Sequence, residues 1–483
     1  YEGPPTDRYN VMSNFDPDVA SPLRVPGLTL RGGLVYPGVD GRGRGLTEPG
    51  FNDWGPRAGF AWQARPKTVV RGGVGIMYVP VNVGVTRTGY TWDTPMVVSI
   101  DGNLTPRDYL RNPFPNGLTN PTGSSLGTLT GVGTDVAGQL PNAKRGYTEQ
   151  WNFTVQHEPW NNWLIEAAWV GNHGVRMLGG SRNLNIISDA DFARGAAELS
   201  QPIPNPFRGI IPTGTLSGAT ITRFQSLLPF PHFTAVTGGY SFLNNSIYHA
   251  LAVKVEKRFS AGFSLLLAYT KSKLIDDGTN SAQVRPGGTF TTLPQNWNNL
   301  RAERSKSAED VPQRAVLTAL WDLPFGKTGS ALARNALGGW QINVSQTMES
   351  GTPIALSSPV TGGGNRPNVA AGAQTRVDAP TLSRWFNTQA FLNPAGYTYG
   401  NVSRTLPDIH SDSLYNLDFS VFKNFTVREG WRVQFRAESF NLTNTPTFDT
   451  PGRVLNSATF GAVTATAFSP KPREVQLALR FIF

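Results

Sequence analysis

The sequence contains no cysteine, few charged residues and no long apolar run. Charged side chains make up 16% of its 483 residues. Without cysteine, the chain has neither a disulfide framework nor a thiolate metal site. Its apolar stretches, such as FSLLLAY from Phe263, have the length of a strand, and none approaches the about 18 residues of a membrane helix. These absences exclude a disulfide-rich domain and a helical membrane protein.

The charge balance is basic but diffuse. Lys and Arg together outnumber Asp and Glu by 43 to 33, which gives a net charge of +10. The basic residues are scattered among acids in nothing longer than pairs such as Lys144-Arg145, so we expect no nucleic-acid partner. A modest basic excess also suits a protein that lies among anionic lipid head groups.

The first residues, YEGPPTDRYN, lack an initiator methionine, a basic segment and an apolar segment. No signal peptide is therefore present in them. We expect the chain to be a piece of a longer precursor.

Alternation of apolar and polar residues dominates the chain. In residues 147–158, for example, Trp151, Phe153 and Val155 fall on one face and polar residues on the other. Such alternation requires an apolar and a polar environment on opposite faces of a strand. It predicts eleven strands, in addition to a stub at the start of the chain: 57–63, 68–79, 147–158, 162–173, 247–259, 263–273, 312–322, 339–349, 413–426, 430–438 and 473–483. Only residues 188–200 predict a helix, and a short one.

The connections between these strands alternate between short and long, with one link of intermediate length at 323–337. The long ones are rich in Gly, Pro, Asn, Ser and Thr and cover residues 80–146, 174–246, 274–311, 350–412 and 443–472. Connections of this length are improbable inside a compact soluble domain. A β-sandwich has shorter strands and short links at both ends. Short periplasmic turns and long extracellular loops are typical of an outer-membrane barrel. The sequence therefore predicts an all-β fold, a transmembrane antiparallel β-barrel with about twelve strands.

Aromatic residues gather at the short-connection end of the predicted strands. Amphipathic rings prefer the interface between membrane and water. We predict an aromatic girdle formed by Trp160, Trp163, Phe259, Phe263, Trp321, Trp340, Phe425 and Trp431.

The last strand, REVQLALRFIF, alternates until its final residue. We expect one row of side chains to face lipid: Val475, Leu477, Leu479, Phe481 and Phe483. In a soluble edge strand, such a row would invite aggregation. An alternating last strand that ends on Phe resembles the signal by which the barrel assembly machinery recognises its clients, so we predict that role for these five residues.

Several stretches carry a family resemblance, among them YTEQWNFTVQHE, EAAWVGNHGVRM, DVPQRAVLTALWDLPFG and FRAESFNLTNTPTF. Together they resemble the barrel segments of TonB-dependent, Oar-like outer-membrane receptors, which often carry a carboxypeptidase-regulatory-like domain. The resemblance spans roughly the whole chain. It implies a barrel of about 22 strands with an N-terminal plug, which takes up large substrates with energy from the TonB complex. No TonB box and no plug are found in this chain, so residues 1–483 resemble the C-terminal barrel portion of a larger receptor.

Polar residues on the last strands form a predicted ladder on the lumen side. Its members are Asn416, Asp418, Arg432, Gln434, Arg436, Glu438 and Arg480. Inside a plugged barrel, such groups must satisfy one another or the plug. We interpret the ladder as support for the barrel wall and the plug, with a substrate path as the alternative.

Catalytic and metal motifs are weak. GSSLG at 123–127 matches a nucleophile elbow around Ser125, but it lies in a Gly/Thr-rich loop and not between a strand and a helix. The five His lack a paired metal spacing, and DDGTN at 276–280 lacks the alternating ligands of a calcium loop. We predict no enzyme activity and no cofactor.

Three functions fit the sequence. The first is uptake of a large extracellular substrate by a TonB-dependent receptor. The alternatives are a surface adhesion or secretion-associated protein and a passive porin-like channel. The partners expected for the receptor are outer-membrane lipid and lipopolysaccharide, the barrel assembly machinery, an unassigned extracellular ligand, and the TonB complex through the N-terminal part that this chain lacks.

Overall fold

The computed structural model describes residues 6–48, 53–79, 86–139, 144–178, 182–212, 214–238, 242–278, 294–326, 330, 335–360, 365–428 and 431–483. The chain divides into two compact units. The first comprises Tyr1–Asp53, Pro80–Arg145 and Leu178–Phe242, and the second comprises Trp54–Val79, Gly146–Met177 and Leu243–Phe483. The prediction of one barrel domain over residues 1–483 stays a prediction.

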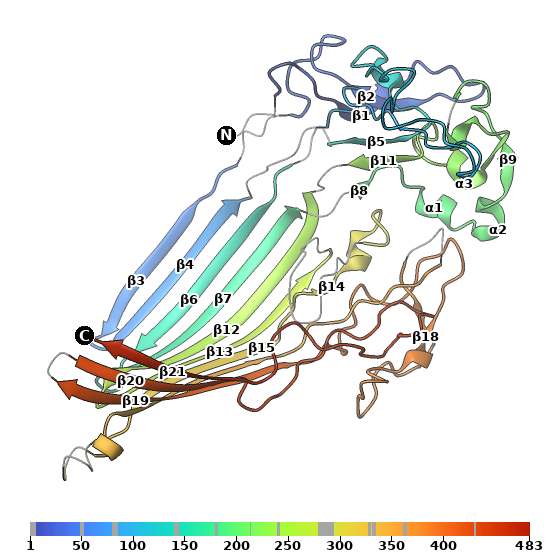
Figure 1. Ribbon diagram of the computed structural model, residues 1–483. Coiled ribbons are helices and arrows are strands. Elements are labelled where there is room, and N and C mark those ends of the chain that lie inside the picture. Colours follow the sequence, from blue (N-terminus) through green and yellow to red (C-terminus); the bar gives the residue numbers. More distant parts are fainter. Residues whose placement is uncertain are drawn as a thin grey trace. The chain divides into compact units, whose positions relative to one another are not determined.

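The second unit is built on a 12-stranded antiparallel sheet (Figure 1). Its strands are β3 (Arg57–Arg65), β4 (Thr68–Tyr78), β6 (Tyr147–His157), β7 (Trp163–Leu178), β12 (Phe242–Ser260), β13 (Phe263–Asp276), β14 (Ser305–Lys306), β15 (Gln313–Asp322), β16 (Trp340–Glu349), β19 (Leu414–Arg428), β20 (Trp431–Phe440) and β21 (Glu474–Ile482). Apart from β14, which pairs with β13, neighbours in the sheet follow the order of the chain from β3 to β21.

The predicted fold class is confirmed, because every alternating segment is one of these strands and short connections alternate with long ones. Within the described residues, β3 and β21 each pair on one side only, so the sheet does not close on itself. The twelfth strand is β14, while the first five residues, at the predicted stub, lie outside the described residues.

The register keeps apolar residues on one face across the strands. Leu477 lies opposite Ala437, Ala437 opposite Val421, Val421 opposite Ile342, and Ile342 opposite Trp321. Cross-strand partners point to the same side of a sheet. One row of apolar side chains therefore runs across five strands, as the alternation predicts.

Several strands are longer than predicted, and β7 and β12 are extended the most. β7 continues to Leu178, where the alternation predicts an end at residue 173, and β12 begins at Phe242, where it predicts residue 247. These extensions read GVRML and FLNNS, with no regular alternation. The backbone therefore stays in the sheet over these residues, although their side chains do not alternate between apolar and polar. Alternation alone does not predict such extensions.

The first unit contains three small sheets and short helices. Its elements are β1 (Asn14–Ala20), β2 (Arg31–Val35), η1 (Gly127–Leu129), β5 (Asp135–Gly138), β8 (Arg182–Asn183), α1 (Asp189–Phe192), α2 (Ala196–Leu199), β9 (Pro202–Pro204), η2 (Thr215–Ser217), β10 (Thr220–Thr222), α3 (Arg223–Ser226) and β11 (Ala235–Gly238). β1 pairs with β2, β9 with β10, and β11 with both β5 and β8.

The prediction of a single helix over residues 188–200 is wrong. α1 ends before Gly195, which has φ of +75°, and α2 begins after it. That left-handed conformation suits glycine and interrupts a helix.

One aromatic core joins distant segments of the first unit. Phe15 of β1 makes edge-to-face contacts with Phe230 and Phe233, at centroid distances of 5.0 and 5.9 Å. Gly138 of β5 passes so close to Phe15 that a Cβ atom there would collide with its backbone. The segment before β3 and the first two long connections are therefore packed into one body.

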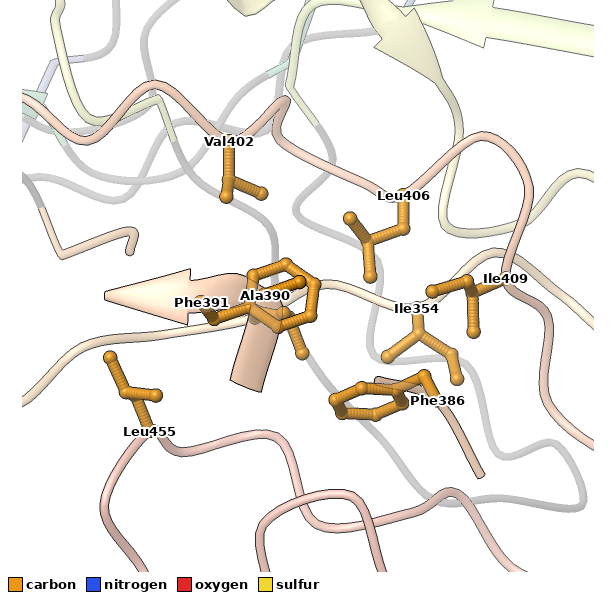
Figure 2. Packing of buried hydrophobic residues seen from close by; sticks show 9 residues of the cluster. Ile354, Phe386, Ala390, Phe391, Val402, Leu406, Ile409 and Leu455 are labelled. Atoms are coloured by element: carbon orange, nitrogen blue, oxygen red, sulfur yellow. The ribbon is translucent and has the colours of Figure 1, made fainter. Parts of the chain in front are cut away.

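The long connections of the second unit form a core of their own (Figure 2). Ile354, Phe386 and Phe391 of the β16–β19 connection cluster with Leu455 of the β20–β21 connection. This region also contains η3 (Leu300–Glu303), β17 (Asn368–Val369), η4 (Thr388–Ala390) and β18 (Phe391–Leu392). No helix among the described residues is both long and apolar enough to cross a membrane.

Candidate functional site

The apolar row of β21 lies fully in the open. Its five side chains are exposed by 63 to 88% and point away from the polar residues between them: Val475, Leu477, Leu479, Phe481 and Phe483. The ring of Phe483 lies 5.9 Å from that of Trp431 on the neighbouring strand. The predicted role of this row in barrel assembly stays a prediction.

The seven ladder residues share the opposite face of β19, β20 and β21. Gln434 lies opposite Arg480 and Asn424, and Glu438 lies opposite Gln476. Three hydrogen bonds of this face each join an amide side chain to a charged one. Asn416 Nδ2 donates to Asp418 Oδ1 (3.0 Å), Arg436 Nε to Gln434 Oε1 (2.7 Å), and Gln476 Nε2 to Glu438 Oε2 (2.7 Å). Arg432 is exposed on the same face, at the short-turn end.

The eight girdle residues all lie at the end of the sheet that carries the short turns. Trp160 and Trp163 flank the β6–β7 turn with rings 6.2 Å apart, and Phe263 pairs with Trp321 beside the β12–β13 turn. Phe259 stands at the end of β12, and Trp340 and Trp431 open β16 and β20. Phe425 lies opposite Val433, near the same end of β19.

Two lysines lie among the aromatic residues of the girdle, where the sequence pattern did not predict them. Lys423 donates to the backbone oxygen of Gly338, and its ammonium lies 5.3 Å from the ring centre of Trp340 and 5.2 Å from that of Phe425. Lys257 donates to the backbone oxygens of Ser260 (2.9 Å) and Phe263 (2.8 Å). Both ammonium groups are thus turned to backbone oxygens at this end of the sheet, Lys257 to those beside the β12–β13 turn and Lys423 to that of Gly338 in the β15–β16 connection.

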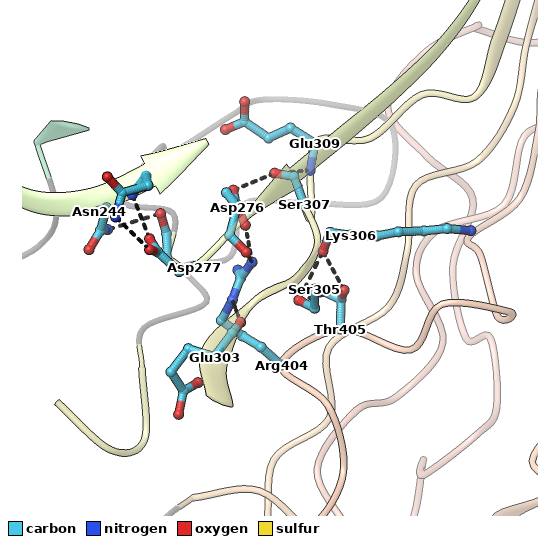
Figure 3. Close-up of polar contacts among 12 residues, drawn as sticks. Asn244, Asp276, Asp277, Glu303, Ser305, Lys306, Ser307, Glu309, Arg404 and Thr405 are labelled. Carbon is cyan, nitrogen blue, oxygen red and sulfur yellow. Dashed lines mark hydrogen bonds and ion pairs between the residues drawn. The ribbon is translucent and has the colours of Figure 1, made fainter. Parts of the chain in front are cut away.

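A buried ion pair anchors the long connections of the second unit at the other end of the sheet (Figure 3). Arg404 of the β16–β19 connection is 2% exposed and pairs with the carboxylate of Asp276, at the end of β13. Its guanidinium also donates to the backbone oxygens of Asp276 (3.0 Å) and Glu303 (3.1 Å). Ser307 Oγ donates to the second carboxylate oxygen of Asp276 at 2.7 Å. Burial lowers the pKa of Arg404 to about 10, so the side chain remains charged at neutral pH.

A second buried pair lies beside the first. Arg366 Nη2 is 3.0 Å from Glu303 Oε1, and both side chains are almost completely buried. Burial raises the pKa of Glu303, and the charge of Arg366 opposes that rise. Two ion pairs therefore join three stretches of connection, around residues 276, 303–307 and 366–404, to the sheet.

Asp276 and Asp277, at the start of the segment DDGTN, take part in these contacts. Asp276 pairs with Arg404, and Asp277 accepts hydrogen bonds from the backbone N–H (2.7 Å) and the side-chain Nδ2 (3.0 Å) of Asn245. Residues 279 and 280 of the segment lie outside the described residues. No group of three potential metal ligands is found in the part of the chain that the structure describes.

Ser125 of the GSSLG segment is placed in a loop and donates to the backbone oxygen of Thr122 at 2.7 Å. The 3-10 helix η1 that follows it has three residues. The strand and helix that a nucleophile elbow requires do not flank this serine.

The family model of an outer membrane beta barrel domain matches residues 1–476. The chain belongs to this family. This outer-membrane barrel domain is therefore located in the outer membrane, which confirms the predicted location and fold. A comparison with curated protein sequences gives no match.

The barrel domain is similar to solved structures of larger outer-membrane proteins. Three of them are the outer membrane transporter YddB from Escherichia coli, the ferripyoverdine receptor of Pseudomonas aeruginosa bound to ferripyoverdine, and the siderophore receptor PiuA from Acinetobacter baumannii. Their sequence identities to this chain are 9, 8 and 9%, with TM-scores of 0.39, 0.38 and 0.37. The matches cover 86, 93 and 95% of this chain but only 38, 34 and 38% of those chains, so it spans well under half of their length.

Proposed function

We propose that this chain is the barrel part of a TonB-dependent receptor that takes up a large extracellular substrate. The family supports the outer-membrane barrel, and the resemblance of the strand segments supports the receptor. The observation that carries the proposal is the place of the buried core. Of the buried apolar side chains among the described residues, the strands of the large sheet contribute only Ala168 and Ala250. The rest lie outside that sheet, almost all of them in the first unit and in the long connections.

Folded connections favour recognition over simple diffusion. Ordering a loop costs about 1–2 kcal/mol of conformational entropy per residue. A passive channel does not require ordered loops around its pore. Here that cost is offset by aromatic clusters and by the buried pairs of Arg404 and Arg366. A fixed surface at the long-connection end is what capture of an extracellular ligand requires.

The predicted residue sets take roles within this proposal. The apolar row of β21 faces lipid and serves as the assembly signal. The aromatic girdle lies at the periplasmic interface, among lipid head groups. The polar ladder lines the lumen, where it supports the wall and meets the plug. The TonB complex acts through the N-terminal part of the receptor.

The test uses the full-length protein in two assays. A receptor of this kind is plugged, so it should show no steady conductance in a planar bilayer. It should also be retained on the immobilised periplasmic domain of TonB. A steady conductance without retention would assign the protein to passive channels and refute the proposal.

A surface adhesion or secretion-associated role is the second candidate, and one feature of the first unit favours it. Residues 97–108 form a backbone-paired hairpin whose tip carries Ile100 and Leu104, 76 and 84% exposed, and Leu110 follows at 87%. Contiguous exposed apolar patches mark interaction sites, and these three side chains lie within eleven residues of one another in the chain. A protein that neither conducts nor binds TonB, but loses attachment of the host cells to a surface on Leu104→Asp substitution, would support this role instead.

A further inference from the structure

Three arginines on the polar face of the last strands are close neighbours. Arg480 of β21 lies opposite Gln434 of β20. Arg432 and Arg436 lie two positions to either side of Gln434 and point to the same face. Both are therefore diagonal neighbours of Arg480, at about 7–8 Å. We call Arg432, Arg436 and Arg480 the arginine cluster.

Neutral groups position Arg436 of the cluster without reducing its charge. Arg436 Nε donates to Gln434 Oε1 at 2.7 Å, and the guanidinium carbon lies 4.7 Å from the ring centre of Phe422. Gln434 Nε2 donates in turn to Asn424 Oδ1 at 2.9 Å. These contacts orient one edge of the Arg436 guanidinium. Its terminal nitrogens have no hydrogen-bond partner within the described part of the chain.

The carboxylates of the same ladder are engaged elsewhere. Glu438 accepts from Gln476, and Asp418 accepts from the backbone N–H of Asn441 at 2.9 Å. Among the described residues, no carboxylate lies within 4.0 Å of a nitrogen of the arginine cluster. Glu438, two positions from Arg436 on the same face of β20, is the nearest acid of the ladder, but it binds Gln476 and no guanidinium nitrogen.

Another arginine on the same face of the sheet is paired with a carboxylate. Arg314 of β15 lies opposite Glu349 of β16, and Arg314 Nε is 3.2 Å from Glu349 Oε2. A sheet face of this kind thus accommodates a paired arginine without difficulty. The arginine cluster departs from that arrangement and keeps three like charges together, which repel each other when no anion lies between them.

We propose that the arginine cluster binds an acidic polypeptide segment that lies along the polar face of the sheet. Guanidinium groups bind carboxylates in a planar, two-pronged geometry. An extended chain places alternate side chains about 6.4–6.8 Å apart, close to the spacing of the cluster. An extended segment with acids at alternate positions therefore reaches all three arginines, whereas a single small anion reaches one or two. The inference rests on the proposed function, in which this face lines the lumen.

The test is chemical footprinting of arginines in the full-length protein, reconstituted in lipid nanodiscs. Phenylglyoxal modifies free guanidinium groups, and mass spectrometry gives the rate at each arginine. Rates are compared for the protein alone, in high salt, with a short oligoglutamate peptide, and with citrate at the same carboxylate concentration. Arg314 is the matched control, because its own carboxylate partner should make it indifferent to added anions.

Two results support the inference. In the first, the cluster is protected in the protein alone and becomes reactive in high salt, so the acidic segment belongs to the protein. In the second, the cluster reacts freely and oligoglutamate slows it by about tenfold or more, roughly the effect of one charge-assisted hydrogen bond, while citrate does not. In either case, Arg480→Gln should remove the protection of the two remaining arginines, and Arg314→Gln should leave it unchanged.

Two other results overturn it. Equal protection by citrate and oligoglutamate would assign the cluster to small anions. Free reaction of the cluster under every condition would leave it as a solvated part of the wall. Failure of the proposed function has a separate signature, since a passive channel conducts steadily whatever occupies this face.

Discussion

Replacing Arg404 by glutamine tests whether buried charge holds the β16–β19 connection in place. Arg404 is 2% exposed, pairs with Asp276 and donates to two backbone oxygens. Glutamine is too short to make these bonds and carries no charge. Removing one partner of a buried pair leaves the other charge uncompensated, which costs about 3–5 kcal/mol. Ser307 still donates to Asp276, so we expect the lower end of that range.

The measurement is the rate at which a protease cleaves this connection in the reconstituted protein. When opening and closing are fast, cleavage follows the population of the open form. A cost of about 3 kcal/mol then raises the cleavage rate by roughly two orders of magnitude. Arg384→Gln is the matched control, because Arg384 is an exposed arginine in the same connection.

A cleavage rate for Arg404→Gln within about threefold of the control would refute this reasoning, since exposed substitutions usually change stability by no more than about 0.5 kcal/mol. The double variant with Asp276→Asn adds a second check. It removes both charges, so the two costs should not add. Additive costs would show that the pair itself is not what anchors the connection.

Three further predictions concern other parts of the molecule. Burial lowers the pKa of His232 from its ordinary 6.5, so the unfolded chain takes up a proton before the folded one does. The first unit should therefore lose stability as the pH falls below about 6.5. Hydrogen exchange of that unit measures the loss, and His232→Gln should reduce the dependence of its stability on pH. Leu479→Arg places a charge on the apolar face and should cost about 2–4 kcal/mol at mid-membrane depth, whereas Gln476→Arg, on the polar face, should be tolerated; the fraction of heat-modifiable, folded protein on a gel decides. Gly351→Ala drives a Cβ atom into a backbone oxygen that cannot move aside and should speed proteolysis of the β16–β19 connection, while Gly43→Ala, with open space around it, should have no effect.

The sheet could be predicted from the sequence because two environments impose their pattern on it. Each strand between lipid and a polar interior must alternate, and the alternation marks β20 and β21 without reference to any other part of the chain. The pattern carries no information where that constraint ends. The extensions of β7 and β12 were missed for this reason, and the helix over residues 188–200 was wrong because Gly195 interrupts it.

The folded connections could not be predicted, because their contacts join residues far apart in the sequence. The ring of His232 lies 3.2 Å from the backbone oxygen of Gly32, across 200 residues of chain. Arg404 is a lone basic residue between Ser403 and Thr405, and its partner Asp276 is 128 residues away. No local pattern distinguishes such residues from those of a solvated loop. The residues of the ladder and the girdle could be predicted from the sequence. The hydrogen bonds between them could not, because they depend on how neighbouring strands pair.

The two lysines of the girdle give an independent measure of where the apolar layer ends. A lysine on a lipid-facing surface is costly unless its ammonium reaches polar groups, so long basic side chains turn towards the interface. Lys257 and Lys423 stand on different strands, yet each ammonium meets an aromatic ring and a backbone oxygen at the same end of the sheet, that of Phe263 for Lys257 and that of Gly338 for Lys423. Two unrelated residues thus place the polar boundary at the level where the aromatic rings gather. Because neither lysine contributed to the prediction of the girdle, their positions support the proposal that this end of the sheet lies at the periplasmic interface.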